Sequence, residues 1–376
     1  MTRAHPNFFE QHKVLGYGLL FVGVVLVTVV VDIIARKILD KINLGHESTI
    51  RIESRIYHHG FQPNAEGTIR WGKAKYSAFT NSLGFLDARK REVPLHTEKY
   101  RVVFIGDSFT EGVGYPYPQT FVGLLHSRFA DIEILNAAAV SYSPIIYYRK
   151  MKHFIEDVGL TFDELVVCLD ISDIWDENWY YLDSNTNQIR ERPANRSLGY
   201  HPPFIRRIIR KVFDSTVLMK SLYDGLVSMG FFRGNPLTLE ATKSLWTISK
   251  TYYEGYGRTG LEKSAQHLSE LAHLLHDKGI HMTLMVYPWP DQIYFEDLHS
   301  RQVTYWQAWT AQQNVRFVNL FPHFIGQRPA REILDTYFIR DDIHWNEEGH
   351  RLVAKVLAQE LLPTTHVGLG SPSVAQ

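Results

Sequence analysis

The stretch that most constrains the fold begins at Val102. Four consecutive apolar residues, Val102 to Ile105, run directly into Gly106, Asp107 and Ser108. A short apolar run bounded by a turn signal is typical of a buried strand, and in particular of a parallel one. Because glycine permits a sharp turn, Ser108 is expected just past the carboxyl end of this strand, where open α/β sheets bind ligands. A hydroxyl there fits a nucleophile, and it equally fits an ordinary Asp-Ser turn.

A second polar motif, Asp341-Asp342-Ile343-His344, stands near the other end of the chain. A serine hydroxyl needs a base to become a nucleophile, and the base needs a group that holds its tautomer. Asp341 lies three residues before His344, so one turn of chain can bring its carboxylate onto the imidazole. The sequence therefore predicts a triad of Ser108, His344 and Asp341, with Asp342 as the alternative carboxylate. Most of the 18 histidines, His350 among them, lack such a motif and are expected to be surface or packing residues.

Gly-Asp-Ser early and Asp-x-x-His late, with alternating strands and helices between them, resemble the SGNH (GDSL-type) hydrolases, and specifically the membrane-anchored bacterial members. The resemblance runs from about Tyr100 to Leu362. It implies a flavodoxin-like three-layer α/β/α sandwich with a five-stranded parallel sheet in the order 2-1-3-4-5. It also implies ester chemistry without a cofactor. The expected strands are 101–106, 131–136, 165–170, 281–287 and 315–320.

The same resemblance implies an oxyanion hole, which in this chain would use Ser108, Ser141 and Ser172. Ser108 contributes its backbone N–H. Ser141 stands where the family has a glycine, and a serine still offers an N–H at that place. Ser172 stands where the family has an asparagine, and its hydroxyl is a shorter donor than an amide. Both positions depart from the family pattern.

Three residues are expected beside the substrate: Asp107, Trp175 and Trp289. Asp107 is expected to fix the turn that carries the nucleophile. The two tryptophans follow predicted strands, at the edge where a ligand is expected. The face of Trp175 would suit a sugar ring; the alternative is packing within an insert. Four carboxylates between Asp170 and Glu177 could hold a hard cation, but they also fit loop capping, and no metal site is predicted.

The strand–helix alternation stops between about residues 175 and 256, longer than a common βα connection. Inserts at such loops often build a substrate wall. Within this insert, apolar residues recur at a helical period over 204–213, with Arg206, Arg207, Arg210 and Lys211 on the opposite face. Such a helix can lie on an anionic membrane surface, or it can cover a core with a solvated outer face.

The N-terminal region contains 18 residues without a charge, Val14 to Val31. As a helix this run would be roughly 27 Å long, close to the thickness of a bilayer core. We expect a single membrane-spanning helix over 14–35; a signal peptide is the alternative, although no cleavage pattern follows. The flanking basic residues slightly favour a cytoplasmic catalytic domain. The resemblance instead implies a periplasmic or extracytoplasmic domain, and we follow it.

The remaining segments and partners follow from these features. Residues 1–13 are expected to flank the helix, 36–99 to form a linker and approach segment, 100–362 the hydrolase-like domain, and 363–376 a loose tail. The formal net charge of zero gives no indication of a nucleic-acid partner. The expected substrate is an acylated carbohydrate or another small ester. Three activities stay open: hydrolysis, acyl transfer to a sugar hydroxyl, and a non-catalytic scaffold in a membrane polysaccharide assembly.

Overall fold

The computed structural model describes residues 13–44, 50–72, 74–192, 241–340 and 342–361. The chain divides into two compact units, which are described separately. The first comprises residues 1–47 and 200–234, and the second comprises residues 48–199 and 235–376. The predicted basic helix over 204–213 and the predicted tail lie outside the described residues.

Within the first unit the structure describes one helix, α2 (Lys13–Leu44). Its segment Tyr17–Ala35 is long and apolar enough to cross a membrane, by length and composition. The one hydroxyl in its middle, on Thr28, donates to the Val24 carbonyl at 2.8 Å, so the helix satisfies this polar group internally. A signal sequence near an N-terminus has the same properties, so this helix alone is compatible with either reading.

The second unit is built on an eight-stranded sheet in the order β12-β11-β8-β6-β7-β5-β4-β3. Five of these strands are parallel, and their spatial order is 2-1-3-4-5 in chain order, which confirms the prediction. The two central strands, β6 and β8, are buried along their whole length. This is expected of parallel strands that are covered on both faces. The parallel strands are β6 (Arg101–Gly106), β7 (Glu133–Asn136), β8 (Glu164–Leu169), β11 (His281–Val286) and β12 (Arg316–Asn319).

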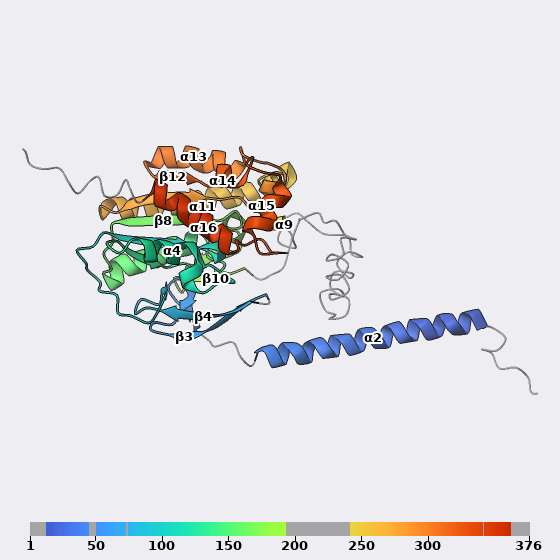
Figure 1. Cartoon of the computed structure of the whole chain (residues 1–376). Coiled ribbons are helices and arrows are strands. Elements are labelled where there is room, and N and C mark those ends of the chain that lie inside the picture. The colour runs from blue at the N-terminus through green and yellow to red at the C-terminus, as the bar shows by residue number, and fades with distance from the viewer. Residues whose placement is uncertain (1–12, 45–49, 73, 193–240, 341, 362–376) are drawn as a thin grey trace, which may run out of the picture. The chain divides into compact units, whose positions relative to one another are not determined.

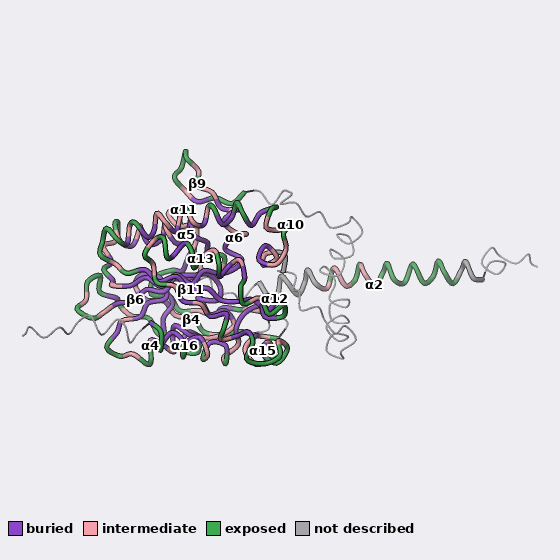
Figure 2. The backbone as a smooth tube through the Cα atoms, turned by 90° about the horizontal axis from the view of Figure 1, so that it is seen from above, coloured by how far each residue is buried: buried purple, intermediate pink, exposed green. Residues whose placement is uncertain are grey.

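Helices cover both faces of this sheet, so the three-layer α/β/α sandwich is confirmed (Figure 2). One face carries α5 (Pro144–Lys152), α11 (Arg258–Asp277) and α13 (Arg301–Gln313), and the other carries α4 (Phe121–Arg128) and α16 (Glu347–Glu360). The shorter helices are α3 (Ser108–Glu111), η1 (Tyr117–Gln119), η2 (His153–Val158), α6 (Asp173–Asp176), α9 (Ala241–Ser244), α10 (Lys250–Tyr252), η3 (Tyr253–Gly257), α12 (Pro290–Tyr294), α14 (Phe321–Phe324) and α15 (Ala330–Tyr337).

The last helix shows why these residues form these elements. The Asn346 side chain caps α16 by accepting the N–H of Gly349 at 3.0 Å, and asparagine is a favoured residue at this position. Glu347 and Glu348 lie in the first turn, where negative charge is favourable. The apolar stripe that contains Val353 is buried against the sheet layer.

Three further strands extend the sheet beyond β7: β5 (Leu86–Asp87), β4 (Ala74–Thr80) and β3 (Glu66–Trp71), all antiparallel. They lie at the opposite side of the sheet from β12 (Figure 1). The prediction of a linker over 36–99 is therefore wrong for residues 51–87. Two separate hairpins complete the unit, one of β1 (Arg51–Ser54) with β2 (His58–Phe61), the other of β9 (Tyr180–Asp183) with β10 (Gln188–Glu191).

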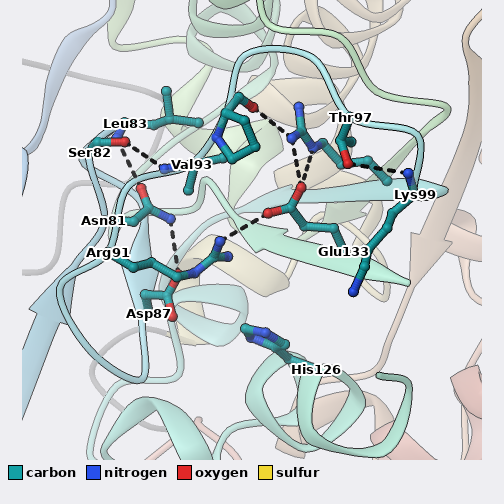
Figure 3. Close-up of polar contacts among 12 residues, drawn as sticks. Asn81, Ser82, Leu83, Asp87, Arg91, Val93, Thr97, Lys99, His126 and Glu133 are labelled. Carbon is teal, nitrogen blue, oxygen red and sulfur yellow. Dashed lines mark hydrogen bonds and ion pairs between the residues drawn. The ribbon is translucent and has the colours of Figure 1, made fainter. Parts of the chain in front are cut away.

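The loop after these strands is tied to the parallel sheet by charged side chains (Figure 3). The Asn81 amide donates to Asp87 at 3.1 Å, and Arg91 donates to Asp87 at 2.8 Å and to Glu133 at 2.9 Å. Glu133, the first residue of β7, also accepts from the buried Arg101 at 2.7 Å. Because these bonds join β5, the loop and the start of β6 and β7, the N-terminal strands are an integral part of this unit.

Candidate active site

The nucleophile candidate, Ser108, is the first residue of α3, and only Asp107 separates it from the end of β6. Asp107 caps this short helix by accepting the N–H of Phe109 at 3.1 Å. A Cβ at Gly106 would lie 2.2 Å from the Thr110 hydroxyl, so only glycine lets the chain turn this closely on itself. The turn therefore presents Ser108 at the carboxyl end of the strand, as the sequence predicts.

Ser108 and His344 meet although 236 positions separate them in the chain. Ser108 Oγ lies 2.7 Å from His344 Nε2. His344 Nδ1 lies 2.6 Å from Asp342 Oδ1, which also accepts the backbone N–H of His344 at 3.1 Å. A serine, an imidazole and a carboxylate in this order form the arrangement of a nucleophile, its base and the group that orients the base.

The carboxylate in this arrangement is that of Asp342, the alternative that the sequence left open beside Asp341. Asp341 lies outside the described residues. Nδ1 of an imidazole carries a single hydrogen, and Asp342 is its acceptor. The physical reason lies in the loop, which folds back through hydrogen bonds between Ile339 and His344 and between Asp342 and Ile339. This tight turn brings together the side chains of Asp342 and His344, which are two positions apart.

Hydrogen bonds keep Asp342 ionised. Burial pushes the pKa of this carboxyl upward, but hydrogen bonds from His344 and from the Trp71 indole outweigh burial, and the pKa lies below its ordinary value. An ionised carboxylate in contact with His344 Nδ1 favours the protonated form of the imidazole.

Two aromatic rings hold the imidazole of His344. The Phe109 ring lies 4.6 Å from it, and the Trp71 ring meets it edge-on at 4.9 Å. His344 is only 4% exposed. Packing on two sides limits the orientations that the ring can adopt, which favours a pre-organised base.

The predicted oxyanion donors lie on two loops. Ser141 has a φ of +59°, a left-handed conformation that glycine adopts more readily. Its carbonyl accepts the Tyr180 hydroxyl at 3.0 Å. Among the described residues, neither the Ser108 nor the Ser141 backbone N–H has a protein acceptor. Both groups are therefore available to a ligand.

Ser172 is 4% exposed and precedes α6. Its backbone N–H donates to Asp170 at 2.7 Å, and its carbonyl accepts the N–H of Asp176 at 2.9 Å. Within the described part of the chain its hydroxyl has no hydrogen-bond partner. The role of this hydroxyl in an oxyanion hole stays a prediction.

Of the three residues predicted beside the substrate, Asp107 and Trp289 are buried and Trp175 is half-buried. Trp289 is 1% exposed, and its indole N–H donates to Asp170 at 2.7 Å, so this ring supports the floor of the site. Trp175 packs edge-on against Tyr256 at 4.7 Å, which supports the packing alternative. Asp107 is buried beneath the nucleophile and accepts the Ser108 hydroxyl at 3.2 Å.

Three buried carboxyl groups, those of Asp107, Asp170 and Asp173, lie together below the nucleophile, with one oxygen of each within 4.8 Å of the others. Burial, followed by the charge of Asp170, raises the pKa of Asp107 well above its ordinary value. Burial and the charges of Asp107 and Asp170 do the same to the pKa of Asp173. Both shifts favour the neutral acid at Asp107 and Asp173, which lessens the charge repulsion within the cluster.

Two residues with close contacts here, Trp71 and Glu111, were missed by sequence reasoning. Trp71 belongs to β3, and 271 positions separate it from its partner Asp342. Glu111 belongs to the Gly-Asp-Ser stretch itself, and it accepts the N–H of Val140 beside the predicted oxyanion donor at 2.8 Å. The position of Glu111 in the motif was a usable signal, whereas Trp71 had none.

The sheet order and the serine–histidine–aspartate contacts agree with what the resemblance to SGNH hydrolases implies. Residues 245–374 match a family model described as the SGNH hydrolase-like domain of acetyltransferase AlgX. The matched segment includes Asp342 and His344, and Ser108 lies before it. The resemblance to SGNH hydrolases is thereby confirmed, and it supports an enzyme that cleaves or transfers acyl esters.

Solved structures with a similar chain include the esterase EstA of Pseudoalteromonas sp., at 13% identity, with 71% of this chain and 100% of that chain covered and a TM-score of 0.36. An acetyl xylan esterase, AlAXEase, is 12% identical over 70% of this chain and 100% of its own, with a TM-score of 0.40. The lipase/acylhydrolase of Enterococcus faecalis is 13% identical over 70% and 95%, with a TM-score of 0.37. A comparison with curated proteins found no match.

Proposed function

We propose that this protein is a serine esterase that removes an acyl group, such as acetyl, from a carbohydrate or another small ester. The observation that carries the proposal is the 2.7 Å contact between Ser108 Oγ and His344 Nε2. A serine hydroxyl within hydrogen-bond reach of an oriented imidazole is the general requirement for covalent acyl chemistry.

In the first half of the reaction, Ser108 Oγ attacks the carbonyl carbon of the ester while its proton passes to His344 Nε2. The carbonyl oxygen becomes an oxyanion, to which the N–H groups of Ser108 and Ser141 and the hydroxyl of Ser172 are the donors we assign. Asp342 stabilises the imidazolium. When the tetrahedral intermediate collapses, the alcohol leaves with the proton of His344, and the acyl group stays on Ser108.

In the second half, a water molecule attacks the acyl carbon and gives one proton to His344 Nε2. Collapse of the second intermediate breaks the bond between the acyl carbon and Ser108 Oγ. The proton on His344 returns to Ser108, and the free acid is released. Each half uses the same base and the same oxyanion donors, so one site suffices for both.

Acyl transfer is the second candidate, because the family model that matches residues 245–374 is described with an acetyltransferase. In this alternative a sugar hydroxyl replaces water in the second half of the reaction, and the triad is unchanged. Exclusion of water from the acyl-enzyme would decide between the two outcomes. The contact between Ser108 and His344 argues against a non-catalytic scaffold.

We further propose that α2 keeps the protein in a membrane as a single-pass anchor, with the catalytic unit on the periplasmic or extracytoplasmic side. The apolar segment Tyr17–Ala35 supports the anchor, and the resemblance to membrane-anchored SGNH hydrolases supports the side.

A fluorophosphonate probe, applied to the full-length protein and followed by mass mapping, tests the proposal directly. We expect a covalent adduct on Ser108 and hydrolysis of a small aryl acetate, both abolished by Ser108→Ala. The matched control is Ser127→Ala, which removes an exposed hydroxyl on α4 and should change neither. A folded protein whose Ser108 does not react would contradict the proposal. Adding a polysaccharide acceptor then separates hydrolysis from transfer by the product that carries the acyl group.

A further inference from the structure

Trp71 reaches the triad from a part of the chain that the family match does not include. It is the last residue of β3, and it pairs with Ala74 at the turn of the β3–β4 hairpin. Because the ladder ends here, the side chain is not confined between neighbouring strands. The hairpin therefore presents one large aromatic side chain at its tip.

This side chain makes two contacts with the triad. Its Nε1–H donates to Asp342 Oδ2 at 2.9 Å. Its ring meets the His344 imidazole edge-on, with centroids 4.9 Å apart and an interplanar angle of 83°. One residue therefore contacts both the base and the carboxylate that orients it.

The hydrogen bonds of Asp342 are divided between its two oxygens. Oδ1 accepts both donors of His344, and Oδ2 accepts Trp71. A carboxylate held at one oxygen can still rotate about its last bond, whereas one held at both oxygens cannot. The Asp342 side chain is 24% exposed, so without the indole its outer oxygen would turn to water.

We propose that Trp71 is a positioning residue of the triad: the β3–β4 hairpin completes the active site by fixing Asp342 and covering one side of His344. The inference rests on the proposed function, since it concerns the same triad. Indole is a donor only, so it can bind the carboxylate without competing for the proton that His344 transfers. A fixed carboxylate raises the fraction of enzyme in which the base is aligned.

The test compares Trp71→Phe with the wild type in the full-length protein. Phenylalanine keeps an aromatic ring beside His344 but has no N–H for Asp342. We expect kcat on an aryl acetate, and the rate of fluorophosphonate labelling of Ser108, to fall roughly tenfold with KM unchanged. Trp309→Phe is the matched control. It removes the hydrogen bond from the indole of Trp309 on α13 to Ser269 on α11, and it should leave both rates unchanged.

A double-mutant cycle with Asp342→Asn keeps the inference testable if Trp71→Phe also lowers thermal stability. If Trp71 acts through Asp342, the Trp71→Phe change should have little further effect on the labelling rate in the Asp342→Asn background. An equal loss in both backgrounds, or a wild-type rate in Trp71→Phe, would overturn the inference. In those cases labelling of wild-type Ser108 would still stand, whereas no labelling of the wild type would count against the proposed function itself.

Discussion

Asp342 is the carboxylate that contacts His344, and we expect it, rather than its neighbour Asp341, to orient the base. Asp342→Asn should lower kcat by roughly 10³–10⁴, because an amide cannot hold His344 in the tautomer that accepts the serine proton. Asp341→Asn should stay within a few fold of the wild type. Steady-state kinetics on an aryl acetate measure both variants, and the reverse order of damage would return the orienting role to Asp341.

Ser172 is the residue that departs furthest from the family pattern. Its N–H is already bonded to Asp170, so its hydroxyl is the donor left for an oxyanion. Ser172→Ala should lower kcat by roughly 10²–10³ with little change in KM, and Ser172→Asn should retain activity if the larger amide fits. The thermal midpoint is the control: a lower midpoint with an unchanged kcat would mean that Ser172 serves only its own loop.

At the scale of single residues, the sequence indicated Ser108 and His344 more clearly than the residues that hold them in place. Ser108 follows an apolar run and His344 follows an acidic motif, and both signals are local. The choice between Asp341 and Asp342 depended on how one loop folds back, which spacing alone does not determine. The contact of Trp71 joins residues 271 positions apart, and no local pattern marks it.

Between elements, the loop that carries Ser141 is held from two sides. Glu111 of α3 accepts the N–H of Val140 at 2.8 Å and pairs with Arg51 of β1. His59 of β2 donates to the Val140 carbonyl at 2.7 Å. A left-handed serine persists only where its surroundings fix it, so these contacts are expected to aim its N–H.

Glu111→Ala tests this arrangement between elements. It would leave the Val140 N–H and the Arg51 guanidinium without their acceptor, at a cost of about 1–3 kcal/mol in the free energy of unfolding. We expect kcat to fall about tenfold or more as the Ser141 N–H loses its direction. Glu332→Ala removes the exposed pair with Arg328 and should change the stability by less than about 0.5 kcal/mol. A Glu111→Ala variant with normal kcat would contradict the role of this contact.

Elements differed in how readily the sequence predicted them. The strands β6 and β8 consist mainly of apolar runs, so both were expected near their observed bounds. The strands β3 and β4 are partly exposed, and β5 is only two residues long. β3 pairs with β4, β4 with β5, and β5 joins the parallel strands by pairing with β7, a contact between distant segments that no local pattern marks.

For the whole molecule, buried histidines predict a loss of stability in acid. Burial lowers the pKa of His350 to about 3 and that of His59 to about 4. In the unfolded chain both imidazoles take up a proton below about pH 6.5. Between pH 6.5 and the pKa of each folded histidine, the unfolded state therefore binds more protons than the folded state. Stability should therefore fall as the pH drops through this window.

Urea unfolding at several pH values measures this effect. His350→Gln removes one titrating group while its side-chain oxygen can still accept the Phe121 N–H, which His350 accepts at 3.3 Å. The variant should lose less stability than the wild type between pH 6.5 and 4. An unchanged pH dependence would mean that His350 is protonated in the folded state.

The apolar helix α2 predicts that the full chain partitions into the membrane fraction of cells. We expect the protein to stay with membranes through a carbonate wash, with its N-terminal residues still present by mass. Release by carbonate would contradict the anchor, and loss of the N-terminal residues would identify a signal sequence. A reporter fused to the C-terminus reports the side of the membrane.

The three antiparallel strands beside β7 have a consequence for where the chain can be cut. If the chain began at residue 100, every triad residue would remain. However, β7 would become an edge strand with a row of unpaired backbone groups. An exposed edge strand can pair with strands of other chains. A chain shortened in this way is expected to aggregate, and one that begins before β1 to remain monodisperse. The N-terminal strands would then protect the sheet from other molecules as well as support the chemistry.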